Sequence, residues 1–281
     1  MTISTKSPRL CRAQTGDVQL AYTDEGSGDP IVCIHGSWDN HQSWDDVAEV
    51  LRKDYRVVTY DRRGHSASTD VPGQGRLSED VQDARDLIEA LNLGPAHIIG
   101  HSYGATVAIT LASMFPDTTL SLFVHEPPVF SLLTGNSELE ELRTESMSLM
   151  KQAAGFAEKG EIELAAKLFV EHVAFGEGSW ENLFCSRARA IILSNVDSWV
   201  DQFKDPERLA VDVTTLCDYP NNITFSTGTN SFRTYREVTK KISELLPQAN
   251  VATIKGGAHG AHISHPDLVS KAIRAHLCAT K

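Results

Sequence analysis

The sequence predicts an α/β protein with a mainly parallel sheet, helices on both faces of that sheet and a helical insertion before its last strands. Short apolar runs, typical of strands buried on both faces, alternate with segments of helical periodicity, as in parallel sheets. The alternation stops between residues 130 and 215, where helical segments follow one another. In the regular part, the run Gly100-His101-Ser102-Tyr103-Gly104 joins a strand-like segment to a helix-like one.

The first half of the chain contains most of the expected strands. Residues 18–23 alternate between polar and apolar side chains, which favours an antiparallel edge strand. The later strand-like runs are apolar throughout, which favours burial on both faces. Ser78 is expected to cap the helix that it begins. The remaining elements expected in this half are strands 31–34, 55–60, 95–99 and 120–124 and helices 42–53, 78–91 and 105–112.

The second half begins with helical segments and then returns to strand–helix alternation. This order predicts a core domain formed by residues 1–129 and 216–281, and a helical cap, or lid, domain formed by residues 130–215. Ligands of such sheets bind at the carboxyl ends of the strands. The elements expected here are helices 137–155, 161–175, 179–195 and 197–203, strands 223–227 and 250–255, and helices 235–246 and 265–279.

Composition narrows the class of partner. A formal charge of −11 over 281 residues disfavours nucleic acid, and no apolar run reaches the length of a membrane span. The first residues lack the apolar segment of a secretory signal, and the five cysteines form no CxxC pair. We therefore expect a reduced, cytoplasmic monomer or homodimer that acts on a small molecule.

The run around Ser102 has the G-x-S-x-G pattern of a nucleophile elbow, in which a serine occupies a strained turn between a strand and a helix. Serine is a poor nucleophile until an imidazole takes its proton, and His259, in a glycine-rich loop, is the candidate base. A metal site formed by His259, His262 and His265 is an alternative. No carboxylate accompanies these histidines, and His262 and His265 are more simply surface or supporting residues.

Four motifs occur in order along the chain: His35-Gly36, residues 61–66 (Asp-Arg-Arg-Gly-His-Ser), the elbow, and Gly257-Ala258-His259. With these motifs the chain resembles the α/β-hydrolase superfamily over its whole length except the lid. The resemblance implies an eight-stranded sheet, a helical cap inserted after the sixth strand, and a Ser-acid-His triad with Ser102 as nucleophile and His259 as base. It implies no metal and no organic cofactor.

The triad acid requires a choice between two places in the chain. Many members of the superfamily carry an Asp after the strand that follows the lid, but the loop Gly228-Thr229-Asn230-Ser231 has no carboxylate. Some haloalkane dehalogenases and the zearalenone lactonases instead use a Glu before the lid, where this chain has Glu126. We therefore predict Glu126 as the acid, with Asp218 as its rival and a structural role at the lid hinge as the alternative.

The oxyanion hole is expected to consist of two backbone N–H groups, those of Tyr103 and, by correspondence with the superfamily, Ser37. Trp38 and the Tyr103 side chain are candidates to line the substrate cavity, although both could equally be core residues. His35 and residues 61–63 are expected to brace the loops around the site.

The expected function follows from the nucleophile. A serine at this position excludes the dehalogenases and epoxide hydrolases that use Asp, and leaves an acyl-enzyme route. We expect hydrolysis of a carboxylic ester or lactone of a small or medium, mostly apolar molecule, with lactones suggested by the resemblance to zearalenone-type lactonases. Carbon–carbon bond hydrolysis or perhydrolysis on the same triad, and a non-catalytic ligand receptor on the same fold, are the alternatives.

Overall fold

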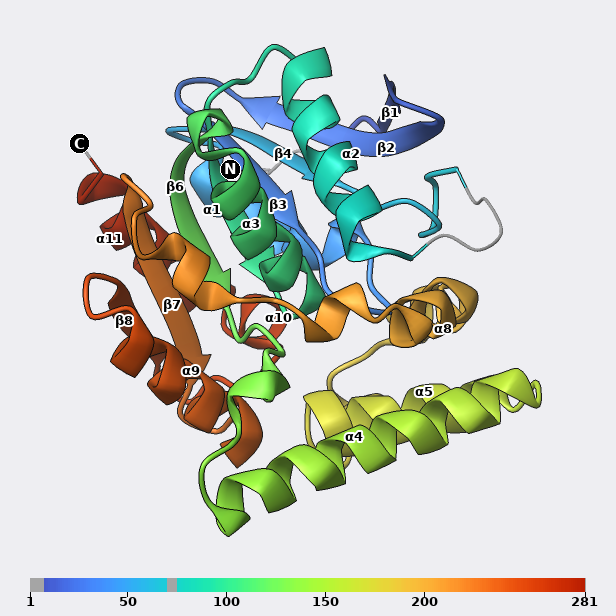
Figure 1. Ribbon diagram of the computed structural model, residues 1–281. Coiled ribbons are helices and arrows are strands. Elements are labelled where there is room, and N and C mark those ends of the chain that lie inside the picture. The colour runs from blue at the N-terminus through green and yellow to red at the C-terminus, as the bar shows by residue number, and fades with distance from the viewer. Residues whose placement is uncertain (1–7, 70–74, 281) are drawn as a thin grey trace.

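The computed structural model describes residues 8–69 and 75–280. In this part of the chain, eight strands form one sheet in the order β1-β2-β4-β3-β5-β6-β7-β8 (Figure 1). Strand β2 is antiparallel to β1 and β4, and all other neighbours are parallel, which confirms the predicted sheet. The strands are β1 (Cys11–Thr15), β2 (Val18–Gly26), β3 (Pro30–Ile34), β4 (Arg56–Tyr60), β5 (Ala96–His101), β6 (Thr119–His125), β7 (Asn222–Gly228) and β8 (Asn250–Ile254).

Helices cover both faces of the sheet (Figure 1). Apolar residues of α2, α3 and α9 share one hydrophobic core with the sheet, and those of α1 and α11 share a second core on the opposite face. Burying each large aliphatic side chain of these cores contributes about 1.5–3 kcal/mol. The helices are α1 (Asp45–Leu51), preceded by a 3₁₀ turn (His41–Trp44), α2 (Leu77–Ala90), α3 (Tyr103–Met114), α9 (Arg233–Leu245), α10 (Ala261–Ser264) and α11 (Pro266–Cys278).

The segment between β6 and β7 is helical, as the sequence predicts. Figure 1 shows α4 and α5 beside one another, below the sheet in that view, with α8 above them. The helices are α4 (Ser137–Glu158), α5 (Ile162–Phe169), α6 (Ser179–Asn182), α7 (Ser186–Ser194) and α8 (Val196–Lys204), and a π-helical turn (Val170–Ala174) follows α5. Short 3₁₀ turns lie at Phe130–Leu132, Glu207–Leu209 and Val213–Leu216. The division into a core domain and a cap domain remains a prediction.

Several elements differ from the sequence expectation. Strand β2 is not an edge strand, because β1 pairs with its outer side. The helix expected over 179–195 is broken between α6 and α7. Ser78 lies inside α2 rather than at its cap, and the backbone N–H of Arg76 instead donates to the Glu79 carboxylate at 3.1 Å. Of the described helices, none has the length and apolar character needed to cross a membrane.

The strand register brings the carboxyl ends of β5, β6 and β7 together. His101 pairs with His125, and His125 pairs with Ser226 on the next strand. The residues that follow these positions, Ser102 and Glu126, therefore emerge side by side at the same edge of the sheet, where parallel sheets bind their ligands.

Candidate active site

Ser102 occupies a sharp turn between β5 and α3. Its backbone has φ 52° and ψ −122°, outside the conformations that L-residues ordinarily adopt. The turn depends on two glycines. A Cβ at Gly100 would lie 2.5 Å from the Gly104 carbonyl oxygen, and a Cβ at Gly104 would lie 2.3 Å from the Ile34 carbonyl oxygen. The strand and the helix are thus packed backbone to backbone, as the elbow prediction requires.

Helix α3 begins directly after Ser102 and directs its unpaired N-terminal N–H groups toward the turn. The positive end of its dipole lies there and favours negative charge. The Ser102 N–H itself donates to the His125 carbonyl at 2.9 Å, which ties the turn to β6. The Ser102 residue is 7% exposed, so it lies within the protein and not on an open surface.

Glu126 and His259 meet at the edge of the sheet. His259 Nδ1 lies 2.9 Å from Glu126 Oε2. Because a carboxylate only accepts hydrogen bonds, Nδ1 carries the proton and the other ring nitrogen, Nε2, is left as an acceptor. The other oxygen, Oε1, accepts hydrogen bonds from Thr227 Oγ1 at 2.8 Å, from the Gly228 N–H at 2.9 Å, and from Ser231 Oγ.

These contacts hold Glu126 in its charged form although it is fully buried. Burial raises the pKa of Glu126. The opposing effects of His125, of His259 and of the hydrogen bond from Ser231 are together larger, and they lower the pKa from 4.5 to about 2. Glu126 also has a positive φ of 49°, which is uncommon for a residue other than glycine. The carboxylate is therefore a fixed, permanent negative charge facing the imidazole.

The His259 ring is held between other rings. Tyr235 stacks on it with centroids 4.1 Å apart, Phe175 contacts it edge-on at 5.5 Å, and His101 lies 4.6 Å away. The residue is 1% exposed. Tyr235, on α9, was not identified from the sequence, because nothing in a helical pattern reveals which loop its ring covers.

The rival acid lies elsewhere. Asp218 is exposed and precedes β7, whereas Glu126 and the β7 residues that it contacts lie at the opposite, carboxyl end of that strand. Asn230 donates to the Gly256 carbonyl at 3.1 Å and so helps to fix the loop before His259. Ser231 supports Glu126 itself, a contact that the sequence did not predict.

The loop after β3 carries Ser37 to the same cavity as Ser102 and Tyr103. His35 braces this loop: its Nδ1 bonds the Gly36 carbonyl at 2.8 Å, and its Nε2 accepts from the Arg62 N–H at 3.0 Å. Burial, followed by the charge of Arg62, holds the pKa of His35 well below its usual value, so it stays neutral. This arrangement matches the expected bracing role of His35.

Residues 61–63 form the second brace. Arg62 and Arg63 make buried ion pairs with two carboxylates of α2, at 2.8 Å from Asp80 and 2.7 Å from Asp83. Asp61 accepts from the backbone N–H groups of His41 at 2.8 Å and Ala67 at 3.0 Å, so it joins the loops after β3 and β4. Removing one partner from such a buried pair is strongly destabilising.

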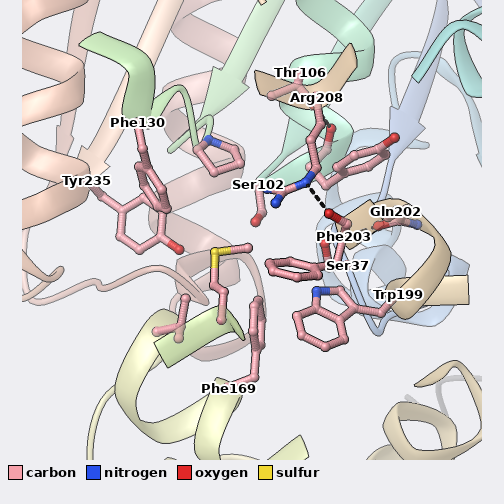
Figure 2. Close-up of a pocket in the computed structure, with 14 residues that line it drawn as sticks. Ser37, Ser102, Thr106, Phe130, Phe169, Trp199, Gln202, Phe203, Arg208 and Tyr235 are labelled. Atoms are coloured by element: carbon pink, nitrogen blue, oxygen red, sulfur yellow. Dashed lines mark hydrogen bonds between the residues drawn. The ribbon is translucent and has the colours of Figure 1, made fainter. Parts of the chain in front are cut away.

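A cavity opens beside Ser102 (Figure 2). Its volume is about 30 Å³, on the measure by which roughly 10–15 Å³ holds one water molecule. A substrate therefore enters only when the lining side chains move apart. The described lining residues are Ser37, Ser102, Tyr103, Thr106, Pro128, Phe130, Met150, Phe169, Val173, Trp199, Gln202, Phe203, Arg208 and Tyr235.

Tyr103 thus lies where the sequence prediction places it, but Trp38 is not among the described residues that line this cavity. The Trp38 ring is 2% exposed and packs on Trp199 at 4.6 Å and Phe169 at 5.6 Å, which do line it. The aromatic residues of the helical segment were missed by the sequence prediction, because a helical apolar stripe does not distinguish core from cavity lining.

The three-histidine metal group is not brought together as proposed. Among the described residues, the side chains close enough to share an ion are Asp39, His101 and His262, whose ligand atoms lie within 4.8 Å of one another. His262 is 1% exposed, and its ring lies 4.8 Å from that of Trp44 and 4.2 Å from that of His101, so of its two expected places, surface or supporting residue, the surface is wrong. His262 lies in the short helix α10, three residues after His259, and the His101 ring that it contacts ends β5.

Comparison with known proteins identifies the family. The model of the alpha/beta hydrolase family matches residues 31–272. An (E)-2-((N-methylformamido)methylene)succinate hydrolase of Acinetobacter baylyi is 24% identical, over 92% of this chain and 94% of its own. The Escherichia coli esterase YbfF is 25% identical, over 95% and 97%. The structure is similar to that of an enol-lactonase from Burkholderia xenovorans, with a TM-score of 0.77 at 16% identity over 95% of this chain and all of that one. Since the family match spans most of the sequence and the fold agrees, the chain belongs to the alpha/beta hydrolase family.

Proposed function

We propose that the protein is a serine hydrolase that cleaves a carboxylic ester or lactone of a small or medium molecule through an acyl-enzyme. Ser102 is the nucleophile, His259 the base and Glu126 the acid. The observation that carries this proposal is the buried hydrogen bond between His259 and Glu126, at the strand ends where the Ser102 elbow emerges. The membership of this chain in the alpha/beta hydrolase family, and its similarity to a named esterase, support the proposed ester hydrolysis.

The geometry suggests how each group acts. Ser102 Oγ attacks the carbonyl carbon while His259 Nε2 takes its proton, and the Glu126 carboxylate stabilises the imidazolium that forms. The oxyanion accepts hydrogen bonds from the backbone N–H groups of Ser37 and Tyr103, near the positive end of α3. The C–O bond to the alcohol then breaks, and that oxygen takes the proton from His259.

A water molecule completes the cycle. His259 takes a proton from the water, whose oxygen attacks the acyl carbon, and Ser102 leaves with the proton returned to its Oγ. Among the described residues no hydrogen bond joins Ser102 Oγ to His259, and the proposed mechanism requires the two side chains to approach when substrate binds. Catalytic hydrogen bonds are often long in ligand-free structures and tighten in the complex.

Lactones belong to the proposed substrates for two reasons. A serine nucleophile with the acid before the helical insertion resembles the zearalenone-type lactonases, and an enol-lactonase shares the fold. A second candidate is hydrolysis of a different bond by the same groups. The Acinetobacter relative that matches almost the full length is named for a formamido-methylene succinate rather than for a simple ester.

A panel of alkyl esters, lactones and carbon–carbon hydrolase substrates tests the proposal. Ester or lactone turnover is expected in wild type, with losses in kcat of about 10⁴–10⁶ in Ser102→Ala and about 10²–10⁴ in Glu126→Gln. Asp218→Asn, an exposed carboxylate before β7, serves as the matched control and should stay near wild type. A Ser102→Ala variant that kept a tenth of the activity would contradict the assignment.

A further inference from the structure

The cavity beside Ser102 is lined mainly by aromatic and aliphatic side chains, and among its described lining residues one carries a charge, Arg208. Arg208 lies in the 3₁₀ turn Glu207–Leu209, just after α8. Figure 2 shows its guanidinium reaching toward Ser102 from the side opposite Phe130 and Tyr235. A cation therefore lies in an otherwise apolar cavity, next to the candidate nucleophile.

The hydrogen-bonding capacity of this guanidinium is largely unused. Its Nε donates to the Phe203 carbonyl at 3.1 Å, and its carbon lies 4.8 Å from the centre of the Phe203 ring. In residues 8–69 and 75–280, neither terminal nitrogen donates to another group, and no carboxylate lies within ion-pair distance. These two nitrogens form the fork that binds a carboxylate through two parallel hydrogen bonds.

Nearby ionisable groups are committed to other contacts. The Asp205 carboxylate accepts from the backbone N–H groups of Leu77 at 2.8 Å and Glu207 at 3.0 Å. Burial raises the pKa of Tyr103 well above its usual value, so its phenol is neutral. Arg62, whose guanidinium lies 4.6 Å from the centre of the Tyr103 ring, is paired with Asp80. The charge that Arg208 presents to the cavity is thus not offset at contact distance by these neighbours.

An unpaired charge is costly even in a partly buried position such as that of Arg208, and a carboxylate ligand reduces that cost while it fills the vacant donors. We propose that Arg208 binds a carboxylate of the substrate, so that the preferred substrates are esters or lactones of small acids that carry a second, free carboxylate. This inference rests on the proposed function and specifies its substrate class. Since Arg208 and Ser102 line the same cavity, we expect a short chain between the carboxylate and the scissile carbonyl.

Matched esters test the preference. Monoethyl succinate and ethyl butyrate have the same chain and differ in a terminal carboxylate or methyl group, as do monoethyl glutarate and ethyl pentanoate. In wild type, kcat/KM is expected to be higher for the acidic member of each pair. In Arg208→Met, the ratio of the two kcat/KM values should fall about 10- to 100-fold, the usual effect of losing a hydrogen bond to a charged group. Arg208→Lys should keep part of the ratio, because it retains the charge without the fork.

The matched control is Arg85→Met. Arg85 also lies over a phenylalanine ring, that of Phe115 at 4.7 Å, but it belongs to α2 and is not among the described residues that line the cavity. This variant should leave the ratio of kcat/KM values unchanged. A binding measurement makes the test independent of turnover: Ser102→Ala should bind monoethyl succinate at least tenfold more tightly than Ser102→Ala/Arg208→Met, as measured by titration calorimetry.

The outcomes separate this inference from the proposed function. Equal kcat/KM ratios in wild type and Arg208→Met, or equal binding by the two Ser102→Ala proteins, would overturn the role of Arg208 even if esters are hydrolysed. If no ester or lactone is hydrolysed, the proposed function fails, and the binding comparison still decides whether Arg208 recognises a carboxylate.

Discussion

Glu126 combines two properties that oppose one another, complete burial and negative charge. Desolvation alone would neutralise it, but the hydroxyls of Thr227 and Ser231, the Gly228 N–H and the His259 ring all donate to it. A carboxylate that accepts this many hydrogen bonds is stabilised in its charged form. The same contacts orient His259, so one network both stabilises the fold and prepares the proposed base.

The pKa of Glu126 predicts how stability depends on pH. Because its pKa falls from the usual 4.5 to about 2 on folding, the charged form contributes stability above pH 4.5, and this contribution disappears as the pH falls from about 4.5 to about 2. The difference in unfolding free energy between wild type and Glu126→Gln should therefore shrink over that range by something on the order of 3 kcal/mol. Denaturant unfolding at stepped pH measures it.

An exposed glutamate of α4 provides the control for this experiment. The difference between wild type and Glu145→Gln should stay nearly flat over the same pH range, because Glu145 is on the surface and its side chain makes no hydrogen bond or ion pair within the described chain. A flat difference for Glu126→Gln as well would mean that the carboxylate is not held charged by its partners.

At the scale of elements, the junction of β5 and α3 positions the nucleophile. The sequence predicted this junction because glycines flank Ser102 and the helix that follows is made of small and apolar residues. The structure supplies the reason: strand and helix approach so closely that no side chain fits at Gly100 or Gly104. Here a local motif and the tertiary packing agree, which is why the prediction succeeded.

Gly104→Ala should therefore be severely destabilising, since its Cβ would lie 2.3 Å from the Ile34 carbonyl oxygen, a backbone atom. We expect a loss of more than about 4 kcal/mol, or no soluble protein. Gly155→Ala is the matched control. Gly155 lies within α4, and a Cβ there meets no atom within 4 Å, so alanine should stabilise by about 0.5–1 kcal/mol. Thermal or chemical unfolding measures both, and similar stabilities would contradict the packing argument.

Other elements were harder to predict. Strand β1 was missed because three of its five residues are polar and none is a large aliphatic or aromatic residue, as it lies at the edge of the sheet. Helices α6 and α7 were merged into one expected helix because the connection between them contains no proline. Arg208 and Tyr235 reach the site from distant parts of the chain, and neither belongs to a motif. By contrast, the position of Glu126 beside His259 could be expected from the sequence, because its strand is followed directly by the helical segment and the later loop has no acid; its role as the acid stays a prediction.

At the scale of the whole molecule, polar contacts hold the helical segment against the loops that follow β3 and β4. Asn195, between α7 and α8, is 1% exposed. Its Oδ1 accepts from the Ser66 N–H at 2.9 Å, and its Nδ2 donates to the Asp39 carbonyl at 2.9 Å. Helix α8 carries Trp199 and Gln202, which line the cavity, so this attachment sets the shape of the site.

Asn195→Ala should loosen this attachment at a cost of about 1–3 kcal/mol, because buried backbone groups lose their partners. Amide hydrogen exchange should accelerate in α7 and α8, while β5 should remain protected. Asn182→Ala is the control: Asn182 is exposed, and its side chain bonds only the Gly178 carbonyl one turn earlier. Uniform acceleration across sheet and helices would instead indicate that the whole protein unfolds as one unit.

The most direct test of the central claim, that Glu126 and His259 activate Ser102, is the rate at which a fluorophosphonate modifies the protein, followed by intact-protein and peptide mass spectrometry. Wild type and Asp218→Asn should be labelled once, on Ser102, at similar rates. Glu126→Gln should be labelled about 10²- to 10⁴-fold more slowly, because the charge that orients and stabilises His259 is gone. Labelling at another residue, or equally fast labelling of Glu126→Gln, would contradict the account.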